Sequence, residues 1–143
     1  MTDCIFCQII TREAPASIFY EDDLVLGFMD IQPVTTGHVM VIPKKHGASL
    51  AELDEETGKH MFTVAQRVAA ALRKSGVKCE GVNLFLADGE AAFQDVFHVH
   101  LHVIPRYKGD SFKISADWSI HPPREELDLV AAQIKGAYDG MWS

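Results

Sequence analysis

Three histidines spaced two residues apart are the strongest candidates in this sequence for a catalytic or metal-binding site. His98, His100 and His102 alternate with three aliphatic residues that run from Val99 to Val103. Successive side chains of a β-strand point to opposite faces, so the imidazoles would share one face while the aliphatic residues pack against a core. Near neutral pH an imidazole can act as a base, an acid, a nucleophile or a metal ligand.

Three interpretations of this segment stay open on the residues alone. It could be a structural or pH-sensitive cluster, or a zinc site, because two histidines two apart on a strand can chelate zinc. It could also perform nucleophilic catalysis, with the central imidazole attacking and its neighbours orienting it. The preceding loop, residues 88–95, favours phosphoryl chemistry, because its backbone amides and the side-chain amide of Gln94 can donate to an anion.

The other residues that could do chemistry are cysteines and isolated histidines. Cys4 and Cys7 form a C-x-x-C pair. No thioredoxin-like βαβ pattern accompanies the pair, which leaves plain thiols or metal ligands. Cys79 is expected to be an ordinary thiol, His60 to be solvated on a helix among charged residues, and His121 to lie in a loop.

Composition and charge bound the class of protein. The chain has 143 residues, of which 48% are hydrophobic and 23% charged, as in soluble single domains. Its formal net charge of −7 argues against nucleic acid or an anionic membrane as a partner. No apolar run is long enough to span a bilayer, and the start Met1-Thr2-Asp3-Cys4 does not resemble a secretory signal. We therefore expect a cytoplasmic protein with reduced cysteines.

The elements that must position these residues follow from hydrophobic periodicity and turn residues. There are no repeats and no linker, so residues 1–143 are expected to form a single α+β domain. The predicted elements are a short helical turn at 4–10, a hairpin of strands 18–21 and 24–29 turning at Asp22-Asp23, a strand at 37–42, a long helix at 54–75, a strand at 82–87, the histidine strand at 97–104 and a second helix at 123–138.

At this point the sequence resembles a known family. HVHLHVI, from His98 to Ile104, fits the H-φ-H-φ-H-φ-φ signature of the histidine triad family of nucleotide hydrolases and transferases. Other matching segments follow in the family's order: CIFCQII from Cys4, YED from Tyr20, FMDIQP from Phe28 and GHVMVIPKKH from Gly37. The resemblance runs from about residue 4 to residue 106. Within the family, the sequence is most similar to the branch of small bacterial nucleotide-binding proteins. Residues 107–143 would then be a C-terminal extension.

The resemblance implies a fold and an activity. The expected fold is an antiparallel five-stranded sheet with one long helix packed on it, and a homodimer in which the sheets of two protomers join. The implied reaction is hydrolysis of purine nucleoside 5′-phosphoramidates or other adenylated compounds through a nucleotidyl-histidine intermediate, with no catalytic metal required. The alternatives are hydrolysis of dinucleoside polyphosphates, a nucleotide-binding protein with weak catalysis, and a metal-dependent hydrolase that uses the triad itself as ligands.

Residue roles carry over by position. His100 matches the nucleophile, His102 a phosphate contact, and His38 a fourth histidine that supports the triad, of which His98 is the first member. Asp30 matches the carboxylate that binds the ribose hydroxyls. The remaining nucleotide-binding positions are the apolar residues of the base pocket and two residues of the phosphate loop: Ile5, Phe6, Ile9, Phe28, Ile31, Gln94 and Asp95.

The resemblance also implies a metal. Some bacterial histidine triad proteins bind zinc through a C-x-x-C pair, the histidine of the Pro-Lys-x-His segment and the first triad histidine. Here those residues are Cys4, Cys7, His46 and His98. Two thiolates and two imidazoles suit a closed tetrahedral zinc site, which would be structural rather than catalytic.

Three positions depart from the pattern of the nucleotide-binding branch, which usually has asparagine, glycine and serine where this chain has Ala87, Phe93 and Asp95. Asp95 places a negative charge beside a phosphate site, so these changes bear on substrate and rate rather than on fold. In the C-terminal segment, Trp118 and Trp142 are candidates for shaping the pocket of a partner subunit.

Overall fold

The computed structural model of the chain describes residues 3–142, so Met1 and Thr2, which the N-terminal prediction included, lie outside the described part. Contacts divide the chain into two compact units, Met1–Phe112 and Lys113–Ser143. The prediction of one domain for the whole chain stays a prediction. The first unit holds helices α1 (Ile5–Ile10) and α2 (Glu55–Lys74), strands β1 (Ile18–Glu21), β2 (Val25–Met29), β3 (Val39–Pro43), β4 (Gly81–Phe85) and β5 (Leu101–Arg106), and two short 3₁₀ turns at Leu50–Glu52 and Glu90–Ala92.

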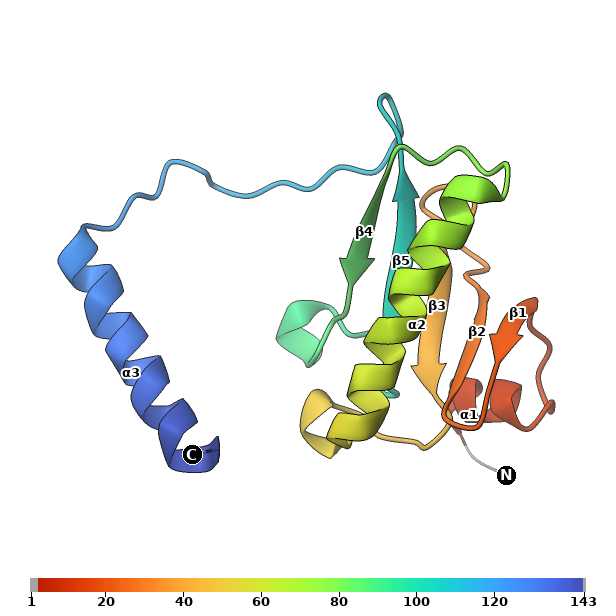
Figure 1. Cartoon of the computed structure of the whole chain (residues 1–143), viewed down its shortest axis with the longest axis horizontal. Coiled ribbons are helices and arrows are strands. Elements are labelled where there is room, and N and C mark those ends of the chain that lie inside the picture. Colours follow the sequence, from red (N-terminus) through yellow and green to blue (C-terminus); the bar gives the residue numbers. More distant parts are fainter. Residues whose placement is uncertain (1–2, 143) are drawn as a thin grey trace. The chain divides into compact units, whose positions relative to one another are not determined.

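The five strands form one sheet in the order β1-β2-β3-β5-β4, and every neighbouring pair is antiparallel. Figure 1 shows α2 crossing one face of this sheet, with α1 near the hairpin turn where β2 begins. The predicted five-stranded antiparallel sheet with one long helix packed on it is therefore confirmed.

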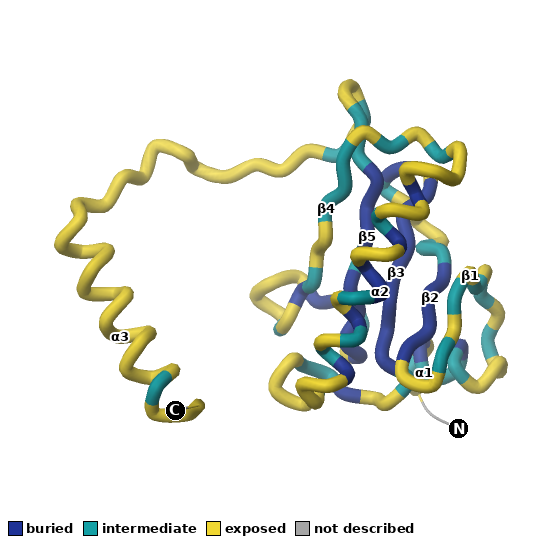
Figure 2. The backbone as a smooth tube through the Cα atoms, in the orientation of Figure 1, coloured by how far each residue is buried: buried dark blue, intermediate teal, exposed yellow. Residues whose placement is uncertain are grey.

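Alternation along the strands divides the buried residues into two cores. On β3, Val39 and Val41 belong to the core under α2, whereas Met40 and Ile42 belong to the core under α1. The central strands are dark along their length in Figure 2, because both of their faces are covered. The sheet is thus a rigid support with one face under α2 and the other turned toward α1 and the histidines.

Helix α2 begins and ends where capping residues predict. The side chain of Asp54 accepts a hydrogen bond from the backbone N–H of Thr57 at 3.0 Å, and Glu55 and Glu56 lie in the first turn, where the helix dipole favours negative charge. Beyond the end, Gly76 has a φ of +89°, a conformation that glycine adopts without strain. The predicted helix at 54–75 is confirmed to within one residue at each end.

The histidine segment differs from the prediction at its start. Regular strand β5 begins only at Leu101, so His98 and His100 precede it, although the predicted alternation holds and Val99 joins the core under α2. Beyond the pair Val41↔Leu101, strand β3 and the histidine segment no longer form a ladder, and the Val99 N–H donates to the carbonyl of Gly47 at 2.8 Å. Because the pairing with β3 stops at Leu101, His98 and His102 have different neighbours.

The second unit contains α3 (Arg124–Trp142), which extends four residues beyond the predicted 123–138. Its first turn carries Glu125 and Glu126, and its apolar residues, among them Leu129 and Ile134, are largely exposed. Within residues 3–142, no helix combines the length and the apolar character that crossing a bilayer requires.

Candidate active site and metal centre

The imidazole of His100 is held by the backbone that precedes it. The side chain is 2% exposed, and its Nδ1 lies 2.8 Å from the carbonyl oxygen of His98. A carbonyl only accepts, so Nδ1 carries the hydrogen and Nε2 keeps its lone pair in the neutral ring. The ring of Phe6 packs edge-on against His100 with 5.1 Å between ring centroids. His100 therefore has a fixed orientation, and its Nε2 keeps the lone pair that nucleophilic catalysis requires. Oδ1 of Asp95 lies 3.4 Å from this nitrogen.

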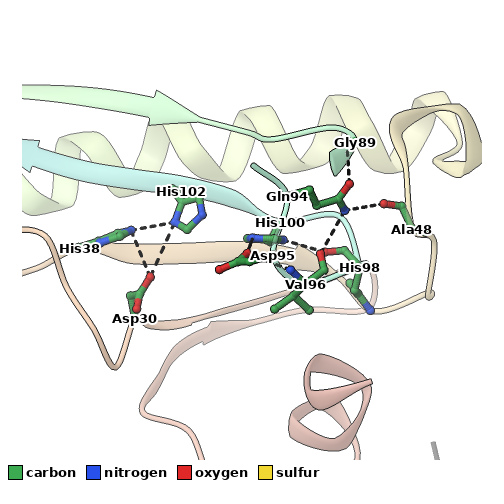
Figure 3. Close-up of polar contacts among 10 residues, drawn as sticks. All are labelled: Asp30, His38, Ala48, Gly89, Gln94, Asp95, Val96, His98, His100 and His102. Atoms are coloured by element: carbon green, nitrogen blue, oxygen red, sulfur yellow. Dashed lines mark hydrogen bonds and ion pairs between the residues drawn. The ribbon is translucent and has the colours of Figure 1, made fainter. Parts of the chain in front are cut away.

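A chain of hydrogen bonds fixes the orientation of His102. The N–H of Val34 donates to Nδ1 of His38 at 3.2 Å, so the neutral His38 ring carries its hydrogen on Nε2. That Nε2 lies 2.8 Å from Nδ1 of His102 and 3.4 Å from Oδ2 of Asp30 (Figure 3). His102 therefore accepts at Nδ1 and presents an N–H at Nε2, which suits a contact with a phosphate oxygen.

Asp30, His38 and His102 also lie close enough together to hold a metal ion. The hydrogen bond from Val34 argues against that use, because Nε2 of His38 carries a hydrogen and offers no lone pair. The geometry instead favours a hydrogen-bonded trio at the edge of the cavity.

Burial lowers the pKa of His38, His98 and His102. Burial lowers the pKa of His102 to about 4, and the neighbouring His100 and His38 contribute to the same direction. Burial also lowers the pKa of His38, and Asp30 opposes this shift in part. Neutral rings are consistent with the donor and acceptor assignments above, because each ring then has one donor and one acceptor nitrogen.

A cavity of about 410 Å³ opens beside His100 and His102. It lies between α1 and the ends of β2 and β3, and most of its lining is apolar. Seven of the eight sequence-predicted nucleotide-binding residues line it, namely Ile5, Phe6, Ile9, Phe28, Asp30, Ile31 and Asp95. The exception is Gln94. The arrangement fits a planar apolar group bound between α1 and the sheet, with Asp30 and the histidines at the polar end.

Gln94 organises the loop instead of facing the cavity. It is 5% exposed, and its side-chain amide donates to the carbonyls of Ala48 and Val96 while its oxygen accepts from the N–H of Gly89 (Figure 3). Both ends of the amide are therefore occupied within the loop, and the donation of Gln94 to a phosphate stays a prediction. Phe93, beside it, has a φ of +67° and is 86% exposed, in a conformation that glycine adopts more readily.

The predicted zinc ligands converge at a second point, next to α1. Sγ of Cys7 lies 3.4 Å from Nδ1 of His46 and 3.6 Å from Nδ1 of His98. Sγ of Cys4 lies 3.5 Å from Nδ1 of His98. The two Nδ1 atoms are 3.2 Å apart. Zinc–ligand bonds of about 2.3 Å to sulfur and 2.0–2.1 Å to nitrogen, in a tetrahedron, give separations of roughly 3.5 Å and 3.3 Å. The four donor atoms thus fit a zinc ion.

His98 has the orientation that a metal ligand needs. Its Nε2 lies 2.8 Å from the carbonyl oxygen of Pro43, so the hydrogen is on Nε2 and the lone pair of Nδ1 points toward the cysteines. Burial and the neighbouring Cys4 raise the pKa of Cys7 to about 11 in the absence of metal. Zinc would bind both sulfurs as thiolates and would link α1 to the start of the histidine segment.

Comparison with known proteins decides the family. The family model described as "HIT domain" matches residues 11–109. The chain belongs to the HIT domain family. An uncharacterised HIT-like protein of Borreliella burgdorferi is 47% identical over 135 residues, which are 94% of this chain and 97% of that protein. The adenosine 5′-monophosphoramidase of Saccharomyces cerevisiae is 39% identical over 126 residues, covering 88% of this chain and 73% of that protein.

Among solved structures, a zinc-bound histidine triad family protein from Mycobacterium smegmatis is similar to this chain. It is 45% identical, with a TM-score of 0.75, and the match covers 94% of this chain and 97% of that one. The HIT domain of this chain thus has both nucleotide-processing and zinc-bound relatives.

Sequence reasoning about this HIT domain missed the backbone groups that orient the histidines. The N–H of Val34 and the carbonyls of Pro43 and His98 fix which nitrogen of each ring carries the hydrogen. Backbone groups have no residue-specific pattern, so only the folded geometry can assign these roles.

Proposed function

We propose that this protein hydrolyses purine nucleoside 5′-phosphoramidates, or closely related adenylated compounds, through a nucleotidyl intermediate on His100. The observation that carries the proposal is the fixed orientation of His100, whose Nδ1 donates to the backbone and whose Nε2 is left with its lone pair at the edge of the cavity. The similarity to a monophosphoramidase supports the substrate class.

The reaction would proceed in two displacements at phosphorus. The lone pair of His100 Nε2 attacks the α-phosphorus, a phosphorus–nitrogen bond to the ring forms, and the bond to the leaving amine breaks. The amine leaves with the electron pair of that bond and takes up a proton from solvent. Water then attacks the same phosphorus, and the bond to Nε2 breaks and returns its electron pair to the ring. One proton of this water stays on the new P–OH group and the other returns to solvent, which balances the proton that the amine took up. Splitting one displacement into two lowers the barrier of each.

The surrounding residues have positioning and electrostatic roles in this proposal. The Nε2–H of His102 would donate to a phosphate oxygen and stabilise the charge that develops there. Asp30 would accept from the ribose hydroxyls, and the apolar end of the cavity would hold the base. Cys4, Cys7, His46 and His98 would hold zinc, which supplies stability to α1 and takes no part in the displacement.

The deciding experiment follows AMP release from adenosine 5′-phosphoramidate. We expect wild-type turnover, a loss of at least 10³-fold in His100→Ala because the nucleophile is missing, and no loss in the control His121→Ala, whose side chain is exposed in the other unit. A nucleotidyl group trapped on wild-type protein and absent from His100→Ala would support the covalent route. Equal turnover in wild type and His100→Ala would refute the role of His100 as the nucleophile.

Chelation separates this proposal from a metal-dependent hydrolase. Removing zinc should lower the melting temperature, because the link between α1 and the histidine segment is lost, while activity at a temperature below melting persists. Immediate and complete loss of activity in still-folded protein would favour the metal-dependent alternative. If AMP binds but no phosphoramidate is cleaved, dinucleoside polyphosphates are the next substrates to test.

A further inference from the structure

A second, polar cavity adjoins the one described above. It measures about 540 Å³, and its lining includes Asp3, Asp95 and Phe97. Cys4 and His46, two of the four predicted zinc ligands, also line it, so this cavity borders the candidate metal centre. Ile5, Asp95 and Val96 line both cavities, so these residues form the boundary between them. A group attached to the α-phosphorus of a nucleotide in the first cavity can therefore extend past Asp95 into the second.

Asp95 lies at the nucleophile and is free to act on a substrate. Its Oδ1 is 3.4 Å from Nε2 of His100 and accepts from the N–H of Val96 at 2.9 Å, and its side chain is 81% exposed. Among residues 3–142 no lysine or arginine forms a salt bridge with it. Asp3 brings a second carboxylate to the lining of the same cavity. Two carboxylates, those of Asp3 and Asp95, therefore line the second cavity beside the nucleophile.

We infer that the second cavity is the leaving-group site and that Asp95, assisted by Asp3, selects leaving groups that are positively charged amines over anionic ones. The inference rests on the proposed function. Its physical basis is Coulombic: a carboxylate attracts an ammonium group and repels a carboxylate or phosphate placed within about 5 Å, and both effects weaken with salt. Dinucleoside polyphosphates, whose leaving group is a highly charged anion, are disfavoured for the same reason.

A third cavity next to His102 has different chemistry. It measures about 180 Å³, and its lining, which includes Val34, Phe85 and Ile104, contains no carboxylate. A leaving group bound there would show no preference for positive charge. A preference for positive charge would therefore favour the cavity at Asp95 over this one.

The experiment compares three adenosine 5′-phosphoramidates whose amines have the same chain length and end in an ammonium, a methyl or a carboxylate group. We expect wild-type kcat/KM to be at least tenfold higher for the ammonium than for the carboxylate compound, and this ratio to shrink toward one in 0.5 M salt. Asp95→Asn should lower the ratio about five- to tenfold, and Asp3→Asn should lower it less. Because the same compounds are compared in each protein, their intrinsic reactivities cancel.

Glu90→Gln is the matched control, since Glu90 is an exposed carboxylate of the same loop that lines neither cavity. The ratio should be the same as in wild type. If Asp95→Asn fails to fold, as thermal unfolding would reveal, Asp95→Ser replaces it.

The outcomes distinguish the two proposals. Cleavage of all three compounds with equal ratios in wild type and Asp95→Asn overturns the leaving-group inference and leaves the proposed function standing. If none is cleaved, the proposed function fails, and calorimetric binding of the same compounds decides the inference. Tighter binding of the ammonium compound that disappears in Asp95→Asn supports it, and equal binding overturns it.

Discussion

Three histidines with identical spacing have three different hydrogen-bond partners. His98 donates to the carbonyl of Pro43, His100 donates to the carbonyl of His98, and His102 accepts from the side chain of His38. The groups left available are the lone pair of His98 Nδ1, the lone pair of His100 Nε2 and the N–H of His102 Nε2. These groups suit a metal ion, a phosphorus atom and a phosphate oxygen, respectively. At the scale of single residues, function is assigned by which nitrogen carries the hydrogen.

The lowered pKa of His102 predicts a dependence of stability on pH. The pKa of this residue is about 4 in the folded chain and about 6.5 when unfolded, so between these values only the unfolded chain binds the proton. The contribution of this residue to the free energy of unfolding is therefore complete above about pH 6.5. It is lost as the pH drops toward 4, which lowers the free energy of unfolding by about 3 kcal/mol. Urea unfolding at a series of pH values should show a shallower fall in His102→Gln.

The exposed His121 provides the control for this measurement, and His121→Gln should follow the wild-type pH dependence. The same slope in wild type and His102→Gln would contradict the assignment of the shift to His102. Zinc loss at low pH acts equally on both proteins, so the difference between them isolates the histidine.

At the scale of elements, a polar contact joins α2 to the turn of the first hairpin. Nε2 of His60 lies 2.5 Å from Oδ2 of Asp22, which also accepts from the hydroxyl of Tyr20 at 2.7 Å. Oδ1 of Asp22 accepts from the N–H groups of Leu24 and Val25, and these bonds together hold the pKa of Asp22 well below its usual range. The prediction that His60 is solvated is therefore wrong. The position of His60 in the helical pattern could not reveal that folding places a carboxylate of the hairpin turn next to it.

Removing this contact should loosen the hairpin from the helix. We expect His60→Ala to lower the free energy of unfolding by about 1 kcal/mol, because the hydrogen bond involves a charged acceptor in a partly buried position. Lys59→Ala is the control, since the pair between Lys59 and Glu56 is largely exposed and contributes little. Chemical denaturation measures both, and equal effects of the two substitutions would contradict this role for His60.

At the scale of the whole molecule, the sheet has an open edge. Strand β4 stands at the end of the strand order and pairs with β5 on one side, while its Leu84 and Phe85 are about half exposed. Unpaired strand edges with apolar side chains readily join another strand. We propose that two protomers associate here, as the family resemblance implies.

Substitution at this edge tests the proposed dimer. Wild-type protein should sediment with twice the mass of the chain, and Leu84→Asp should sediment as a monomer because it places a charge in the proposed interface. The control Leu24→Asp changes an equally exposed leucine at the turn of the first hairpin and should stay dimeric. A monomeric wild-type protein would refute the proposal.

Much of this architecture could be predicted from periodicity and capping. Helix α2, the hairpin and the two-faced histidine segment follow from local patterns. The resemblance pointed to the residues that could hold zinc and to those that line the cavity, and folding brings each set together from distant parts of the chain. The sequence could not reveal that the amide of Gln94 is consumed within its loop or that Val34 orients His38, because both depend on backbone groups brought close by folding. The polar cavity at Asp95 likewise exists only once α1 meets the phosphate loop.

The strict alternation from Val99 to Val103 constrains how this gene can vary. Aliphatic side chains on one face belong to the core under α2, and the imidazoles on the other face belong to the two proposed sites. A single-codon deletion or insertion within this segment would exchange the two faces, placing imidazoles in the core and aliphatic groups at the cavity. Lineages can therefore exchange one aliphatic residue for another here, whereas a change in segment length removes fold and chemistry together.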